Sequence, residues 1–158
     1  MEKGYRHEFK FLISRADAEL LKLRLPHIME RDPHAGETGR YTIRSLYFDD
    51  VHAAAYYEKV DGLDNRAKYR IRFYNYDGSH IKLEKKEKLG NLTRKTAQDI
   101  TKNDARALEY ALSTGCPDTP SGLAEELRLA CLSRGLRPKV LVYYDRTPFL
   151  CHAGNTRI

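Results

Sequence analysis

Arg66-Ala67-Lys68-Tyr69-Arg70-Ile71-Arg72-Phe73-Tyr74 is the stretch of sequence that decides the fold. Basic and apolar residues alternate along it, as side chains alternate between the two faces of a β-strand. One face carries Arg66, Lys68, Arg70 and Arg72, and the other carries Ala67, Tyr69, Ile71 and Phe73. We therefore predict a strand from Arg66 to Tyr76 with one apolar face in a core and one cationic face.

A second basic strand is expected after a short turn. Asp77-Gly78 is typical of a two-residue hairpin turn, and His80–Lys88 is predicted to return beside the first strand. Alternation places Lys82, Glu84, Lys86 and Lys88 on one face of this second strand. If the two faces align, seven positive charges surround one carboxylate.

The other predicted elements are strands and helices that do not alternate as strand–helix units. Apolar patterning predicts further strands at residues 8–13, 41–49, 93–101 and 140–146. Helical spacing and capping residues predict helices between Ser14 and Pro26, from Asn103 or Asp104 through Leu112, and from Ser121 through Ser133. This order predicts an α+β fold with a largely antiparallel sheet and flanking helices.

Length and composition limit the class of protein. The chain has 158 residues, 41% of them hydrophobic and 32% charged, which suits a single domain over residues 1–158. No apolar run approaches the roughly 20 residues that cross a bilayer, and the N-terminus lacks the apolar region of a secretory signal. We expect no membrane span and a cytoplasmic protein. The three cysteines lack the number and spacing of a disulfide framework or a zinc site.

The net charge of +6 favours an anionic partner. Arg6, Glu8 and Lys10 alternate with other residues near the start of the chain, and Arg44 lies in the strand predicted at residues 41–49. Like charges that face one another destabilise a sheet unless an anion offsets them, and arginine with lysine suits a chain of phosphates. A solvated hairpin face is the alternative interpretation. The pattern disfavours nucleic acid as the partner, because most aromatic residues among these cations are predicted to face the core.

Glu8 and Glu84 lie in the middle of the basic strands, where two roles compete. They are candidate ligands for Mg²⁺ or Mn²⁺, which take one or two carboxylates together with substrate phosphates. Alternatively, they pair with neighbouring arginines and lysines. The sequence lacks the common nucleophile, P-loop and zinc motifs. Phosphoryl transfer remains possible, because it can rely on positioning and charge stabilisation.

Several short segments occur in a specific order along the chain, namely Arg6–Ile13, Ser45–Asp49, Lys68–Tyr74, Leu83–Lys86 followed by Lys95, Tyr144–Phe149 and Thr156–Ile158. Together they resemble the VTC domain of polyphosphate polymerases, within the CYTH or triphosphate tunnel metalloenzyme group. The resemblance implies an antiparallel β tunnel that binds ATP and polyphosphate. It also implies transfer of the terminal phosphate of ATP to a growing polyphosphate chain with a divalent metal, commonly Mn²⁺.

The resemblance also assigns residues by position. The phosphate contacts it implies are Lys10, Arg70, Arg72, Lys86, Lys95, Arg146 and Arg157, of which Arg70, Arg72, Lys86 and Arg146 are the expected catalytic residues. The strand-face pattern alone adds supporting cations at Arg44, Arg66, Lys68, Lys82 and Lys88. Glu8 and Glu84 remain the candidate metal ligands.

The sequence departs from the family pattern at its end. Family domains continue beyond the element that contains Ile158, and their later strands supply a metal-binding glutamate and further phosphate ligands. We expect those C-terminal strands to be missing here, which leaves an incomplete tunnel. The chain is then a fragment, a shortened member, or one whose open edge is completed in a homo-oligomer. A polyphosphate-binding module without catalysis and a triphosphate hydrolase are the alternative functions.

Overall fold

The computed structural model describes residues 6–114, 121–153 and 156–158. They divide into two compact units. The first unit contains residues 6–8 and Ile43–Tyr143, and the second contains Phe9–Thr42 and Tyr144–Ile158.

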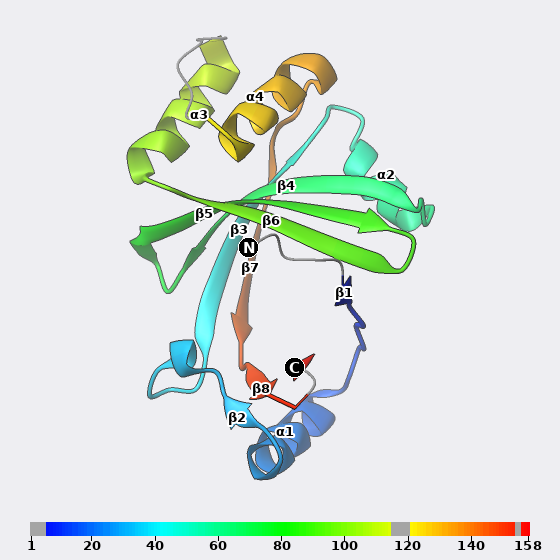
Figure 1. The fold of residues 1–158 in the computed structure, drawn as a ribbon, viewed down its shortest axis with the longest axis vertical. Helices are drawn as coiled ribbons and strands as arrows, with labels where there is room; N and C mark the ends of the chain where they lie inside the picture. Colours follow the sequence, from blue (N-terminus) through cyan, green and yellow to red (C-terminus); the bar gives the residue numbers. More distant parts are fainter. Residues whose placement is uncertain (1–5, 115–120, 154–155) are drawn as a thin grey trace. The chain divides into compact units, whose positions relative to one another are not determined.

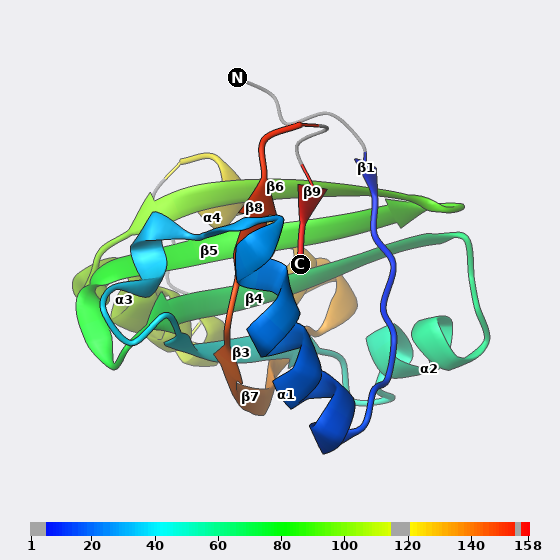
Figure 2. The ribbon, with the colours of Figure 1, turned by 90° about the horizontal axis from the view of Figure 1, so that it is seen from below.

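A six-stranded sheet forms the centre of the first unit (Figure 1). Its order is β1-β6-β5-β4-β3-β7, and Figure 2 shows β4, β5 and β6 side by side. Two of the strands, β3 and β7, continue for two or three residues into the second unit. The strands are β1 (Arg6–His7), β3 (Tyr41–Asp49), β4 (Asn65–Tyr74), β5 (Asp77–Leu89), β6 (Leu92–Ile100) and β7 (Arg137–Arg146).

The register of the β4–β5 hairpin aligns the two basic faces, which was the condition for the expected charge cluster. Arg70 lies directly opposite Glu84, and Lys68 lies opposite Lys86. The flanking pairs are Arg66 with Lys88 and Arg72 with Lys82. Directly opposed residues of an antiparallel pair share a face, so the even-numbered residues of this part of the hairpin lie together.

The predicted turn at Asp77-Gly78 is wrong by two residues. Asn75 and Tyr76 form the turn instead, with φ of 49° and 59°, and β5 begins at Asp77. A type I′ turn requires positive φ at both central residues, which asparagine tolerates well and tyrosine does not. A register shift between Arg72 and Tyr74 moves the turn away from Gly78.

Helices α3 (Lys102–Thr114) and α4 (Leu123–Arg134) cover the apolar face of the β4–β6 sheet (Figure 1). The core contains Ile71 and Leu83 from the sheet, together with Leu108 and Leu127 from the helices. Each such side chain contributes roughly 1.5–3 kcal/mol when it leaves water. Gln98 on β6 fixes α4 at its start, because its side-chain oxygen accepts a hydrogen bond from the Leu123 amide at 2.8 Å.

The predicted strand at Glu8–Ile13 is not formed. The strand β1 ends at His7, which pairs with Leu92, the first residue of β6. The next antiparallel partners would be Asn91 and Gly90, which belong to the β5–β6 turn. Alternating residues form a strand only beside a backbone edge that can accept their hydrogen bonds. Phe9 and Phe11 are consequently 78% and 83% exposed.

The second unit contains the predicted N-terminal helix and a small antiparallel sheet. Helix α1 (Arg15–Arg24) begins with a capping box, in which Ser14 and Asp17 exchange hydrogen bonds. Two 3-10 turns follow it, η1 (Leu25–His27) and η2 (Pro33–Ala35). The sheet has the order β2-β8-β9, with strands β2 (Glu30–Arg31), β8 (Phe149–Cys151) and β9 (Thr156–Arg157).

The structure confirms the α+β class and the antiparallel sheet. In the part of the chain that is described, β1 and β7 end the strand order, so the central sheet is open rather than closed on itself. The helices predicted near residues 103–112 and 121–133 are present. No described helix is long and apolar enough to traverse a lipid bilayer.

Candidate functional site

One face of the central sheet gathers most of the predicted site residues, and we call it the basic face. It lies opposite the face that α3 and α4 cover, because its residues alternate with those of the core. Neighbouring strands contribute uncharged residues to it by register, Ser45 and Tyr47 on β3 and Thr93 on β6. Its charged members are Arg66, Lys68, Arg70, Arg72, Lys82, Glu84, Lys86, Lys88, Lys95 and Asp99.

Glu84 is at the centre of the basic face and is fully buried. Its Oε2 accepts a hydrogen bond from Nε of Arg70 at 2.7 Å, and Nη2 of Arg70 forms an ion pair with the same oxygen, also at 2.7 Å. Oε1 of Glu84 accepts a hydrogen bond from Nζ of Lys95 at 3.0 Å, and Arg72 Nη1 lies 3.6 Å from Oε2. Three cations from two neighbouring strands thus converge on one carboxylate, which leaves a surplus of positive charge.

The ionisation of Glu84 follows from these neighbours. Burial acts to raise the pKa of its carboxyl group, but the charges of Arg70, Arg72 and Lys95 outweigh burial and lower the pKa. Glu84 is therefore ionised at neutral pH. Burial also acts to lower the pKa of Arg70, and the negative charge of Glu84 raises it.

Two residues of β3 orient the arginines. Arg70 Nη1 donates to the hydroxyl of Tyr47 at 2.7 Å, and Arg72 Nε donates to Oγ of Ser45 at 3.1 Å. Sequence reasoning assigned no role to Ser45 or Tyr47. The sequence did contain a signal for them. Ser45, Tyr47 and Asp49 are two residues apart along β3, so they share one face of the strand, and Ser45 and Tyr47 lie opposite Arg72 and Arg70.

Asp49, the last residue of β3, accepts a hydrogen bond from the first turn of α2 (Ala54–Val60). Its Oδ1 accepts from the backbone amides of Asp50 and Ala55, each at 2.9 Å. Arg66 is used at the other end of this helix, where its Nη1 donates to the carbonyl oxygens of Leu63 at 2.7 Å and Glu58 at 3.3 Å. Part of the donor capacity of Arg66 is therefore committed to the backbone.

Lys68 is a half-buried cation with unfavourable surroundings. Burial lowers the pKa of its ammonium group, and the charges of Lys59 and Arg66 lower it further, against a smaller opposing effect of Asp49. The charged form of Lys68 is thus less stable than in water. A bound anion would relieve this.

The outer lysines of the basic face have carboxylate partners. Lys86 Nζ lies 2.6 Å from Glu8 Oε2, and Lys82 Nζ lies 2.7 Å from Asp99 Oδ1. These pairs are partly exposed, so each contributes about 0–1 kcal/mol and can open to another anion.

Arg44 does not lie on the basic face. It is directly opposite Phe73, whose neighbours in the alternation face the core. Its guanidinium stacks 3.9 Å above the ring of Tyr76 and 5.6 Å from that of Tyr143. The expected grouping of Arg44 with the other cations is wrong because its position on β3 has the parity of Leu46 rather than that of Ser45.

Three of the predicted phosphate contacts belong to the second unit. Lys10 is exposed in the segment before α1. Arg146 Nη2 donates to the hydroxyl of Tyr144 at 3.1 Å. Arg157 lies on β9, where its charge acts on Asp32. Burial acts to raise the pKa of Asp32, but hydrogen bonds from His34 and the charges of His34 and Arg157 lower it.

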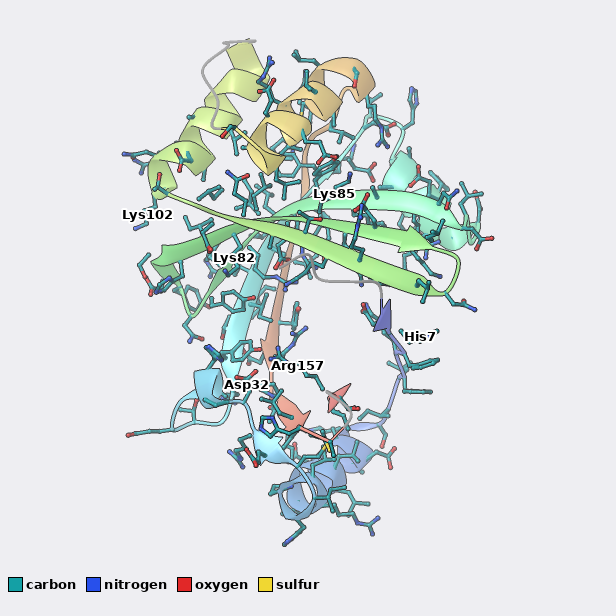
Figure 3. The ribbon with its side chains drawn as sticks, in the orientation of Figure 1. His7, Asp32, Lys82, Lys85, Lys102 and Arg157 are labelled. Atoms are coloured by element: carbon teal, nitrogen blue, oxygen red, sulfur yellow. The ribbon has the colours of Figure 1, made fainter. Side chains whose placement is uncertain are left out.

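The other face of β5 carries a separate polar cluster. Lys85 points away from the basic face while Lys82 lies on it, as Figure 3 shows. Lys85 pairs with Glu87 at 3.1 Å and with Glu126 of α4. Tyr69 donates to Glu126 at 2.8 Å, and burial with this hydrogen bond raises the pKa of Tyr69 to about 12. These contacts bind α4 to the sheet.

The described carboxylates do not fit a metal ion held by the protein alone. No group of three or more His, Cys, Asp or Glu side chains in the described ranges could hold one. Both oxygens of Glu84 already accept from cations, and Glu8 pairs with Lys86. A divalent cation beside Glu84 would be repelled by three positive charges.

Comparisons with known proteins agree with this fold. The family described as VTC domain matches residues 5–158, and the search of curated proteins gives no match. Among solved structures, a protein from Bacillus halodurans described as a candidate adenylate cyclase is similar, with a TM-score of 0.57 and 19% identity. The similarity covers 89% of this chain and 64% of that one, so this chain spans less than two thirds of its length.

Proposed function

The chain belongs to the VTC domain family, and from this premise we propose that it synthesises inorganic polyphosphate from ATP by phosphoryl transfer on the basic face. A terminal oxygen of the growing chain attacks the γ-phosphorus of ATP. The bond between that phosphorus and the β-γ bridging oxygen breaks, and ADP leaves. A divalent metal, Mn²⁺ or Mg²⁺, would be held mainly by the phosphates of ATP and would offset their charge, since the described carboxylates form no metal-binding group.

The surplus of positive charge around Glu84 is the observation that supports this proposal. Arg70, Arg72 and Lys95 carry three charges against one carboxylate. Lysines continue the basic face along β4 and β5, with Lys68 opposite Lys86. A phosphate chain repeats its charge at short intervals, so it can contact such a row of cations with successive units.

The proposed roles of individual residues follow their donor capacity. Arg72, Lys86 and Lys95 contact the transferred and neighbouring phosphates, and Lys68 and Lys82 extend the contact along the chain. Arg70 acts through its hold on Glu84 and Tyr47. For Lys10, Arg146 and Arg157 a phosphate-binding role rests on the family resemblance.

Binding without catalysis is the second candidate function. The observation that favours it is the lack of a metal-binding group among the described residues. In that case polyphosphate binds to the same lysines, and ATP is not consumed. A triphosphate hydrolase is distinguished by release of phosphate from ATP without growth of a chain.

The test is an assay of the protein with ATP and Mn²⁺, in which polyphosphate is detected by gel electrophoresis and released phosphate by a colorimetric assay. We expect chains to form, and we expect Lys68→Gln to reduce the rate about tenfold or more because it removes a contact charge. Arg134→Gln removes the same charge from the exposed end of α4 and should keep the wild-type rate. Binding of polyphosphate with no product from ATP would instead establish the binding module.

A further inference from the structure

We propose that Glu84 is a positioning residue that serves as a built-in counter-anion, which holds Arg70 in place and keeps Arg72 and Lys95 directed at the site of a bound phosphate. This inference rests on the proposed function, because the phosphate it positions is that of the substrate. It assigns Glu84 a role other than metal ligand.

The burial of Glu84 shows that its ion pair is not an ordinary surface pair. The side chain of Asp99, which pairs with Lys82 on the same face, is 75% exposed, whereas that of Glu84 is 0% exposed. A desolvated carboxylate is costly unless cations and hydrogen bonds compensate it. Arg70 and Lys95 supply this compensation from the strands on either side of β5.

Arg70 and Arg72 differ in how many of their hydrogen-bond donors the protein already uses. Every nitrogen of the Arg70 guanidinium has a protein partner, since Nε and Nη2 contact Glu84 and Nη1 contacts Tyr47. Arg72 uses only Nε, toward Ser45, among the residues that the structure describes. Its Nη1 is 3.6 Å from Glu84, too far for a good hydrogen bond. Arg72 therefore keeps donors for a phosphate, and Arg70 acts as a support.

Lys95 is in a similar position to Arg72. Its ammonium group has three donors, of which one contacts Glu84 Oε1 at 3.0 Å. The net charge of the cluster is +2, because it contains three cations and one carboxylate, namely Arg70, Arg72, Lys95 and Glu84. Glu84 thus competes with phosphate for these cations while it fixes where they lie.

The test measures the affinity for tripolyphosphate without metal, by calorimetry, for wild type and Glu84→Gln. Because Gln has nearly the same shape and lacks the competing charge, we expect binding about tenfold tighter. For ATP, both KM and kcat should fall, since Arg72 and Lys95 then bind phosphate well but are poorly directed. Glu126→Gln removes the same charge beside Lys85 on the opposite face, and its affinity should stay within about twofold of wild type.

Unchanged or weaker tripolyphosphate binding by a folded Glu84→Gln protein would overturn the inference, because a carboxylate that does not compete with phosphate for Arg72 and Lys95 gives no gain in affinity when its charge is removed. If that variant does not fold, the ¹³C signal of the Glu84 carboxyl group in the wild-type protein answers the question. It should stay in place when Mg²⁺ alone is added and move when tripolyphosphate is added. A saturable shift with Mg²⁺ alone contradicts the proposed role, whereas failure of wild type to bind tripolyphosphate contradicts the proposed function and leaves the Mg²⁺ result interpretable.

Discussion

Arg70 holds the buried carboxylate of Glu84 through two nitrogens, Nε and Nη2, which both lie 2.7 Å from the same oxygen. The two residues are directly opposite each other on β4 and β5. Because this ion pair is buried, the residues of the basic face contribute to the stability of the fold. Substitutions of its arginines therefore affect stability as well as binding.

Arg70→Met should destabilise the protein by about 3–5 kcal/mol, because Glu84 loses the partner that makes its closest contacts. The loss is measured as a shift of the urea midpoint with an unchanged slope. The double variant Arg70→Met/Glu84→Leu removes both charges and should recover most of the stability. A single variant as stable as wild type would show that Lys95 and Arg72 compensate Glu84 without Arg70.

The stability of the protein should depend on pH through Glu84. Its pKa in the folded protein lies below the ordinary value of 4.5, so its contribution is complete above pH 4.5 and is lost as the pH falls toward the folded-state pKa. The difference in unfolding free energy between wild type and Glu84→Gln should accordingly shrink on acidification below that value. Urea unfolding of both proteins at several pH values measures it, and a difference that grows at low pH would contradict the assignment.

Alternation along β4 and β5 was sufficient to predict a basic side for each strand, and the observed register places the two sides on one face. The pattern requires only that neighbouring residues of a strand point to opposite sides, and this holds for Arg66–Arg72 whatever lies around them. The burial of Glu84 was not predictable in the same way. It depends on side chains from β4 and β6 that meet over β5, which is a property of register and packing between strands.

The errors have related causes. The strand expected at Glu8–Ile13 failed because a strand needs a neighbouring edge, which the pattern of one segment does not reveal. Gly78 is a good turn residue, but the register shift at Arg72/Tyr74 gives the turn to Asn75 and Tyr76. The turn propensity of Asp77-Gly78 therefore predicted correctly that a hairpin forms. The position of the turn depends on the register between the two strands, which this propensity does not determine.

Arg44→Gln should leave the affinity for tripolyphosphate within about twofold of wild type, because Arg44 lies across the sheet from the basic face. It should lower stability by about 0.5–1 kcal/mol through loss of the stacking on Tyr76. Calorimetry and urea unfolding measure the two effects. A large loss of affinity with unchanged stability would assign Arg44 to the phosphate site after all.

Lys68 should report directly on anion binding. Burial and its cationic neighbours lower its pKa below the ordinary value of 10.5, so a phosphate chain that contacts it should raise this pKa. By linkage, the affinity for tripolyphosphate is greatest below the Lys68 pKa of the free protein and declines as the pH rises through it. NMR titration of the lysine side chains with and without tripolyphosphate measures the shift. Lys85 is the control, since Glu126 and Glu87 hold it on the other face and its titration should not respond. Equal pKa shifts of both lysines would indicate nonspecific electrostatic attraction of the anion to a basic protein. Only a phosphate chain bound at the basic face should shift Lys68 and leave Lys85 on the opposite face unchanged.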